Sequence, residues 1–112
     1  MPKPVFVVSE WLPKKGHEKE VFTLFKKLLS LTKEKESGCL KAHVTRQIPH
    51  PGSPGTSKFT IVLLQEYKDL PSFDLHCNTD YVQNFFKTYI DNENPEANLI
   101  EEWRCRLFSE EE

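Results

Sequence analysis

Long hydrophobic segments are missing from this chain of 112 residues. Its longest apolar runs, such as residues 61–64, are far shorter than the roughly 18 to 20 residues that a membrane-spanning helix needs. The first residues, MPKPVFVVSEW, also lack the long apolar region of a signal peptide. We therefore expect a cytoplasmic protein with no membrane partner.

The chain also has few cysteines and no excess of positive charge. The three cysteines, Cys39, Cys77 and Cys105, are odd in number and widely spaced, which suits neither a disulfide framework nor a CxxC metal or redox site. We therefore expect reduced, mostly buried thiols. We also expect no metal site, because His17 and His50 have no paired ligand. Fifteen basic against 17 acidic residues give a net charge of −2, so nucleic acid is not an expected partner.

What the chain does contain is enough apolar sequence for one core. Hydrophobic residues make up 38% of it, which predicts a single domain over residues 1–112 with an acidic tail at 109–112. β-Branched, aromatic and alternating segments predict strands over residues 5–12, 39–48, 59–67 and 99–108. Apolar residues at helical spacing predict helices over residues 17–35, 70–77 and from Thr79 or Asp80 to about 90. Three prolines and two glycines make residues 49–57 a loop.

This order of elements, β-α-β-β-α-β, predicts an α+β protein of the ferredoxin-like type, with helices on one face of an antiparallel sheet. In the second strand we expect Leu40, Ala42, Val44 and Ile48 to share a face, and in the fourth Leu99, Trp103, Cys105 and Leu107. The third strand is apolar on both faces, so both need cover, and the helices of one chain cover only one. A second copy of the chain is expected on the other face.

Four short motifs, in this order and spacing, resemble the antibiotic biosynthesis monooxygenase family. They are the glycine in WLPKKGHEKEV, the step ESGCL into the second strand, the QEY that ends the third, and the spaced His76 and Thr79 of LHCNTDY. The resemblance covers nearly the whole chain. It implies a dimeric α+β barrel in which each protomer keeps a cavity between its sheet and its helices.

The family includes cofactor-free oxygenases of quinols and polycyclic anthrones, haem-degrading enzymes, and an isomerase or processing enzyme for a phosphorylated signalling sugar. The haem-degrading branch carries an asparagine where this chain has Ser9 and a tryptophan near His76, so haem degradation is disfavoured, although His76 and His43 leave haem binding open. The family also has an aromatic residue near Ala42, so the cavity wall is expected to be more open there. The resemblance thus implies an oxygenase that needs no cofactor.

In the quinol-oxidising branch, a base and a dry pocket convert the substrate into an anion that reacts with oxygen. His76 is our candidate for the base, because the reference pKa of histidine, about 6.5, lies near the working pH. Glu66 is a candidate to orient His76 or to bind a substrate hydroxyl, and Tyr81 or His43 to hold the developing oxyanion. The expected apolar walls are contributed by Phe59, Phe85, Phe86 and Trp103.

Each candidate residue also fits a purely structural role. His76 suits the packing of a short helix end, Glu66 an ion pair with Lys68, and the aromatic residues the core or a dimer interface. Three functions therefore stay open. The first is a cofactor-independent monooxygenase of quinol-like or small aromatic substrates, the second a non-oxidative small-molecule isomerase, and the third a non-catalytic ligand-binding or stress-associated dimer.

Overall fold

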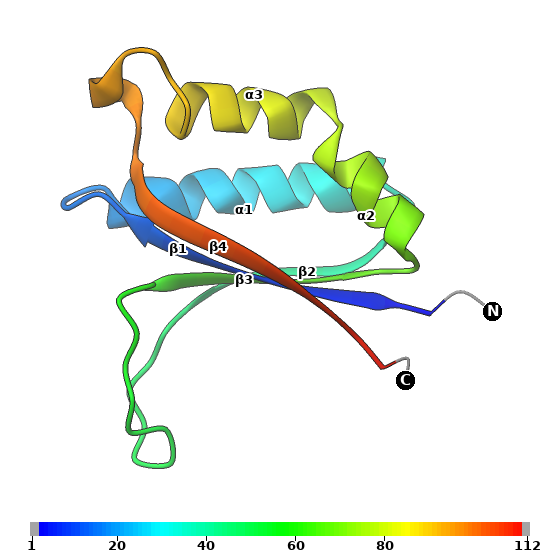
Figure 1. The fold of residues 1–112 in the computed structure, drawn as a ribbon, viewed down its shortest axis with the longest axis horizontal. Coiled ribbons are helices and arrows are strands. Elements are labelled where there is room, and N and C mark those ends of the chain that lie inside the picture. Colours follow the sequence, from blue (N-terminus) through cyan, green and yellow to red (C-terminus); the bar gives the residue numbers. More distant parts are fainter. Residues whose placement is uncertain (1–2, 111–112) are drawn as a thin grey trace.

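Helices cover one face of an antiparallel sheet in the computed structural model, which describes residues 3–110 (Figure 1). The elements in chain order are β1 (Val5–Pro13), α1 (Glu18–Lys35), β2 (Cys39–Arg46), β3 (Ile61–Tyr67), α2 (Leu70–Cys77), α3 (Asp80–Tyr89), a 3₁₀ turn (Pro95–Ala97) and β4 (Ile100–Ser109). The predicted ferredoxin-like α+β fold is confirmed. Of the predicted acidic tail, Ser109 belongs to β4 and residues 111–112 lie outside the described residues.

The sheet has the strand order β2-β3-β1-β4, and every neighbouring pair is antiparallel. On β1, Val7, Ser9 and Trp11 are buried and stand opposite Leu107, Cys105 and Trp103 of β4. Because side chains alternate along a strand, these residues share the face that the helices cover. The predicted common face of Trp103, Cys105 and Leu107 is therefore confirmed, and the residues between them belong to the open face of the sheet.

The second strand departs from the simple alternation that we predicted. A bulge interrupts its register, because Cys39 stands opposite Tyr67 and Lys41 already stands opposite Glu66. Leu40 is the extra residue between them and is 47% exposed. Ile48 lies beyond the end of β2 and is 76% exposed, so neither residue shares the helix-covered face with Ala42 and Val44.

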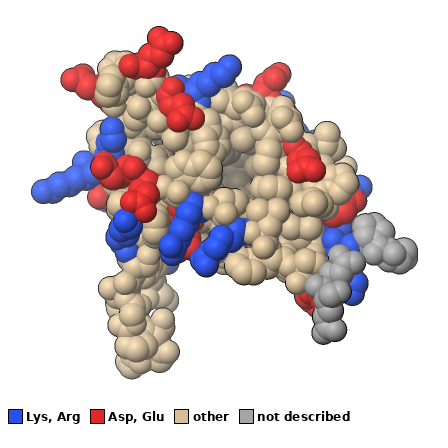
Figure 2. Space-filling view, in the orientation of Figure 1, with Lys and Arg blue, Asp and Glu red and all other residues tan. Residues whose placement is uncertain are grey.

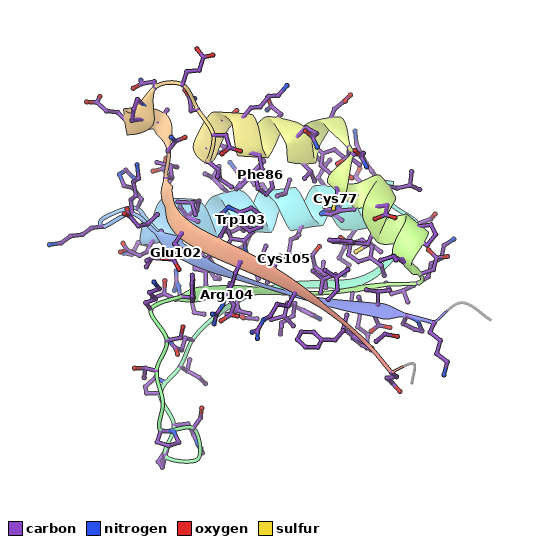
Figure 3. All side chains as sticks on the ribbon, in the orientation of Figure 1. Cys77, Phe86, Glu102, Trp103, Arg104 and Cys105 are labelled. Atoms are coloured by element: carbon purple, nitrogen blue, oxygen red, sulfur yellow. The ribbon has the colours of Figure 1, made fainter. Side chains whose placement is uncertain are left out.

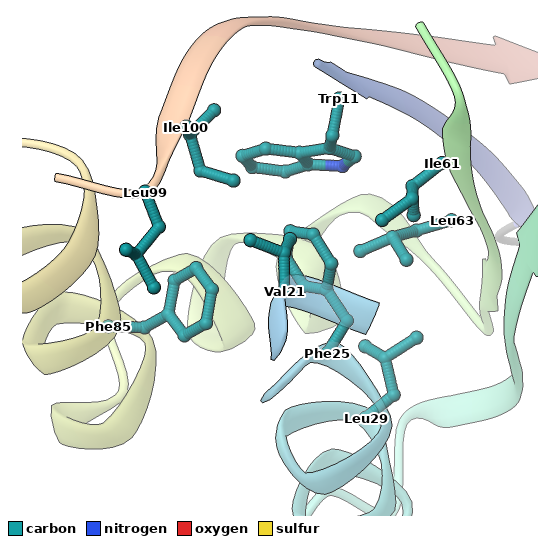
Figure 4. Close-up of a cluster of buried hydrophobic side chains, with 9 residues drawn as sticks. All are labelled: Trp11, Val21, Phe25, Leu29, Ile61, Leu63, Phe85, Leu99 and Ile100. Atoms are coloured by element: carbon teal, nitrogen blue, oxygen red, sulfur yellow. The ribbon is translucent and has the colours of Figure 1, made fainter. Parts of the chain in front are cut away.

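The core lies between the sheet and the helices (Figure 4). Helix α1 buries Val21, Phe25, Leu29 and Thr32, which recur at three- and four-residue spacing and so line one side of the helix. The ring of Phe25 packs against Trp11 of β1 at 4.8 Å and against Phe85 of α3 at 5.2 Å between centroids. Aromatic packing thus ties both long helices to the centre of the sheet.

Side-chain caps fix where the two helices after β3 begin. The Asp69 carboxylate accepts hydrogen bonds from the Ser72 backbone N–H at 2.9 Å and from the Ser72 hydroxyl, and both bonds hold the pKa of Asp69 below its usual range. Thr79 is the N-cap of α3, one of the two positions that we predicted, and its hydroxyl accepts from the Val82 N–H. The short α2 is therefore confined to the stretch between these two caps, with His76 and Cys77 in its last turn.

Gly38 lies where the chain enters β2 against the start of α2. A Cβ atom built on Gly38 would lie 2.4 Å from the Ser72 Oγ and 2.5 Å from its Cβ. We expect Gly38→Ala to destabilise the protein by about 1 to 3 kcal/mol, because the methyl group forces these segments apart. Urea unfolding measures the loss. Introducing Ser72→Gly into this variant should recover part of the lost stability, because it removes the side chain that the new methyl group meets. A double-mutant cycle that shows no coupling between positions 38 and 72 would contradict this close contact.

Candidate functional site

A cavity of about 300 Å³ lies between the sheet and the helices, within the size range of small-molecule sites. Its walls are predominantly apolar and include Phe25, Phe85, Phe86 and Trp103. Figure 3 shows Cys77, Phe86, Trp103 and Cys105 around the space that separates β4 from α2 and α3. The same face is hollowed there in Figure 2, and the surface around the hollow consists largely of uncharged residues.

Two helix ends bring a histidine and a carboxylate together at this cavity. His76 lines the cavity from α2, and its Nδ1 lies 3.1 and 3.0 Å from the two carboxylate oxygens of Glu36, the residue that caps the end of α1. The side chains of His76 and Glu36 are only 9% and 11% exposed. Because a carboxylate accepts hydrogen bonds, Nδ1 is the nitrogen that donates to Glu36, and in the neutral ring Nε2 is then the basic nitrogen. No described residue hydrogen-bonds to Nε2.

Tyr81 completes this arrangement from α3. Its hydroxyl donates a hydrogen bond to Glu36, on the oxygen that His76 Nδ1 also contacts. Burial, together with the adjacent Glu36 carboxylate, raises the pKa of Tyr81 to about 12, so the hydroxyl keeps its proton and stays a donor. Glu36 therefore joins three helices at one point, and it fixes the position and tautomer of the histidine ring.

The sheet contributes two more polar groups to the cavity. The Gln65 side chain on β3 accepts a hydrogen bond from the Tyr67 hydroxyl at 2.5 Å, and Ser9 on β1 accepts one from the Trp11 indole at 2.9 Å. The Gln65 amide nitrogen and the Ser9 hydroxyl proton are thus available as donors. A basic nitrogen on the helix side and hydrogen-bond donors on the sheet side suit a ligand that releases a proton and gathers negative charge on oxygen.

The sequence-predicted residues are only partly brought together. His76, Phe85 and Trp103 line the cavity, and Tyr81 is linked to His76 through the carboxylate of Glu36. Phe59 is 4% exposed but does not line the cavity, and its ring lies 4.6 Å from the Arg104 guanidinium.

Glu66 and His43 lie on the other face of the sheet. Gln65 and Tyr67 point toward the helices, so the intervening Glu66 points away, and His43 stands opposite Leu64 on the same open face. The expected contact of Glu66 with His76 is therefore wrong, and Glu36 takes that place. Since His43 and His76 lie on opposite sides of the sheet, the two side chains do not contact the same ligand in the cavity.

Two functional groups were missed by sequence reasoning. Glu36 sits within the ESGCL step that carried part of the family resemblance, but its role depends on the distance between two helix ends that are 40 residues apart. Gln65 adjoins Glu66, and only the pairing register shows which of these neighbours faces the cavity.

Residues 3–110 contain neither a metal-binding cluster nor a membrane-spanning helix. Within that range no three histidine, cysteine or acidic side chains gather as a metal site. None of the helices described there is long and apolar enough to cross a membrane. The expectation of mostly buried thiols holds for Cys39, whereas Cys77 is half-buried and Cys105 is exposed.

Comparison with solved structures shows the same fold in several bacterial proteins. Protein SO0527 from Shewanella oneidensis superposes with a TM-score of 0.73 at 20% identity, over 97% of this chain and 92% of that one. A Caulobacter crescentus protein, provisionally described as an antibiotic biosynthesis monooxygenase, gives 0.74 at 18% identity over 99% and 92%. A dimeric protein of unknown function with a ferredoxin-like fold, from Bacteroides fragilis, gives 0.70 at 15% identity over 95% of each chain.

Sequence comparison places the chain in a family. No curated protein gave a significant match. The profile of the antibiotic biosynthesis monooxygenase family matches residues 4–88, from β1 through most of α3. This match spans most of the chain and includes Glu36, Gln65, His76 and Tyr81. The chain therefore belongs to the antibiotic biosynthesis monooxygenase family.

Proposed function

We propose that this protein is a cofactor-independent monooxygenase of quinol-like or other small aromatic substrates. The observation that carries the proposal is the pair of Glu36 and His76 at the wall of an apolar cavity of about 300 Å³. Flat aromatic side chains, among them Phe85 and Trp103, suit a planar substrate. The family and the similar structures support this class of reaction, and the substrate itself is part of the proposal.

The reaction begins with a proton transfer from an acidic O–H or activated C–H group of the substrate to His76 Nε2. Glu36 stabilises the imidazolium cation that forms. The electron-rich anion passes one electron to O₂, and the substrate radical and superoxide combine to form a C–O bond. His76 returns its proton to the peroxide. For a CH₂ centre, loss of the remaining C–H proton and cleavage of the O–O bond give a carbonyl and water.

Oxygen consumption by the purified, metal-stripped protein tests this function. The panel consists of hydroquinones and anthrone-like phenols, and His76→Ala is expected to lower the rate by about 10² to 10⁴-fold, the usual contribution of a positioned base. His17→Ala is the matched control, because His17 Nδ1 contacts Glu20 at 3.0 Å on the surface and His17 does not line the cavity. A folded wild-type protein that consumes no oxygen with any member of the panel would contradict the proposal. Anaerobic turnover of the same compounds would favour the isomerase instead.

We also propose that the protein works as a homodimer, with a second copy on the open face of the sheet, and that it acts in the cytoplasm. Apolar side chains on this face include Phe6, Val8, Val62, Leu64 and Phe108. Its buried carboxylate, Glu10, is paired with Arg104 at 3.0 Å and Arg106 at 2.6 Å, and the hydrogen bond from Arg104 in particular holds the pKa of Glu10 below its usual range. An apolar face on which Glu10, Arg104 and Arg106 are paired with one another suits burial against a second protein surface.

Leu64→Asp is expected to break this dimer. Leu64 is 41% exposed at the middle of the open face, and burying an unpaired carboxylate there costs several kcal/mol, which would raise the dissociation constant by about a hundredfold or more. Light scattering at micromolar concentration measures the mass. Leu75→Asp is the matched control, because Leu75 is 71% exposed on α2, away from this face. A monomeric wild-type protein would refute the dimer.

A further inference from the structure

Gln65 is a polar side chain of the cavity whose orientation is fixed by a hydrogen bond from a buried neighbour. The residue is 8% exposed and projects from β3 toward the helices. Its Oε1 accepts the hydrogen bond from Tyr67, and burial of Tyr67 holds the pKa of that phenol above its usual range, so the hydroxyl stays a donor. The amide therefore presents its NH₂ group to other partners. The amide nitrogen has no hydrogen-bond partner among the described side chains. Every fully buried polar side-chain atom of the described residues does have a partner, so this nitrogen is not fully buried and borders open space.

Tyr67 also brings Gln65 and His76 to the same end of the cavity. While its hydroxyl binds Gln65, its ring lies 5.4 Å from the His76 ring between centroids. The phenol is fully buried, and Phe73 packs against its ring at 5.4 Å, so it has little freedom to move. The basic nitrogen of His76 and the NH₂ group of Gln65 are thus placed around one buried residue, and a single small ligand can reach both.

We propose that Gln65, oriented by Tyr67, is a catalytic residue that donates a hydrogen bond to the substrate oxygen on which negative charge develops as His76 removes the proton. This inference rests on the proposed function and adds to it the group that holds the oxyanion, a role for which the sequence had suggested Tyr81 or His43. Tyr81 is occupied with Glu36, and His43 lies across the sheet. Amide donors of this kind act in a water-poor site, where a bond to a charged oxygen is strongest.

The test uses 4-nitrophenol as a probe, bound anaerobically so that no turnover is needed. Its absorbance distinguishes bound phenol from bound phenolate. We expect Gln65→Met, which keeps the length of the side chain but removes its N–H groups, to lower the phenolate-to-phenol ratio of the bound probe about tenfold or more. Gln65→Glu should lower it further, because a carboxylate repels the phenolate. Gln47→Met is the matched control, since Gln47 makes two hydrogen bonds to Ser57 outside the cavity.

Tyr67 is a positioning residue, and Tyr67→Phe tests it. Without the Tyr67 hydroxyl the Gln65 amide is free to turn, so the phenolate-to-phenol ratio of the bound probe should fall, but less than in Gln65→Met. The double variant Tyr67→Phe with Gln65→Met should show the same ratio as Gln65→Met alone. An unchanged ratio in a folded Gln65→Met protein, or a wild-type protein that does not bind the phenolate, would overturn the inference. If oxygen uptake is absent but the ratio depends on Gln65, the oxyanion site stands and the monooxygenase proposal fails. If oxygen uptake is present but insensitive to Gln65→Met, the monooxygenase proposal stands and the oxyanion role of Gln65 fails.

Discussion

Glu36→Gln is expected to lower the rate of oxygen consumption about a hundredfold or more while leaving the fold intact. The Glu36 carboxylate accepts from both His76 Nδ1 and the Tyr81 hydroxyl. A glutamine has only one accepting oxygen, so its NH₂ group can face His76 and favour the tautomer that carries the proton on Nε2. That tautomer has no free base at the cavity, and the neutral amide no longer stabilises an imidazolium cation.

The measurement is the turnover number for oxygen uptake with the best substrate of the panel, alongside circular dichroism to confirm folding. Glu20→Gln is the matched control, because Glu20 forms the exposed pair with His17. The control should retain the wild-type rate. Equal rates for Glu36→Gln and the wild type would show that His76 does not depend on this carboxylate, and the proposed base would then need another partner.

Phe25→Ala is expected to reduce the free energy of unfolding by about 3 to 5 kcal/mol. Phe25 is fully buried, contacts the rings of Trp11 and Phe85, and forms part of the cavity wall, so its loss leaves a void that joins the cavity. A typical domain is stable by only about 5 to 15 kcal/mol, so this variant should unfold at a much lower urea concentration.

Phe22→Ala makes the same change on the same helix and serves as the control. Phe22 is only half-buried and stacks under the Arg46 guanidinium at 4.2 Å, so we expect a loss of about 1 kcal/mol. Urea titrations followed by tryptophan fluorescence compare the two. Similar losses at both positions would mean that the aromatic centre of the core is less tightly packed than the ring distances indicate.

Much of the fold could be predicted because local patterns are strong in this chain. Helix α1 carries apolar residues at helical spacing from Val21 to Leu31, and both Asp69 and Thr79 are good caps directly before a helix. The bulge at Leu40 was not predictable, because alternation assumes that every residue has one partner on the next strand.

The candidate site was less predictable than the fold. His76, Phe85 and Trp103 were identified because their residue types are chemically distinctive. The sequence pointed to Glu66 and not to its neighbour Gln65, because a carboxylate suggests catalysis more readily than an amide does. The one-residue offset between them decides which face of the sheet each occupies, and the pairing register rather than residue type sets that offset.

The sequence by itself determined the order of strands and helices, the ferredoxin-like class and the family, because hydrophobic periodicity and short motifs act over a few neighbouring residues. Only the tertiary structure decided that Glu36, at the end of α1, meets His76 of α2 and Tyr81 of α3, which are 40 and 45 residues away in the sequence. The tertiary structure also decided that Gln65 rather than Glu66 faces the cavity. Such contacts depend on how the helices cross the sheet and on strand register. Both are set by the packing of the whole core, and no short segment of the chain encodes them.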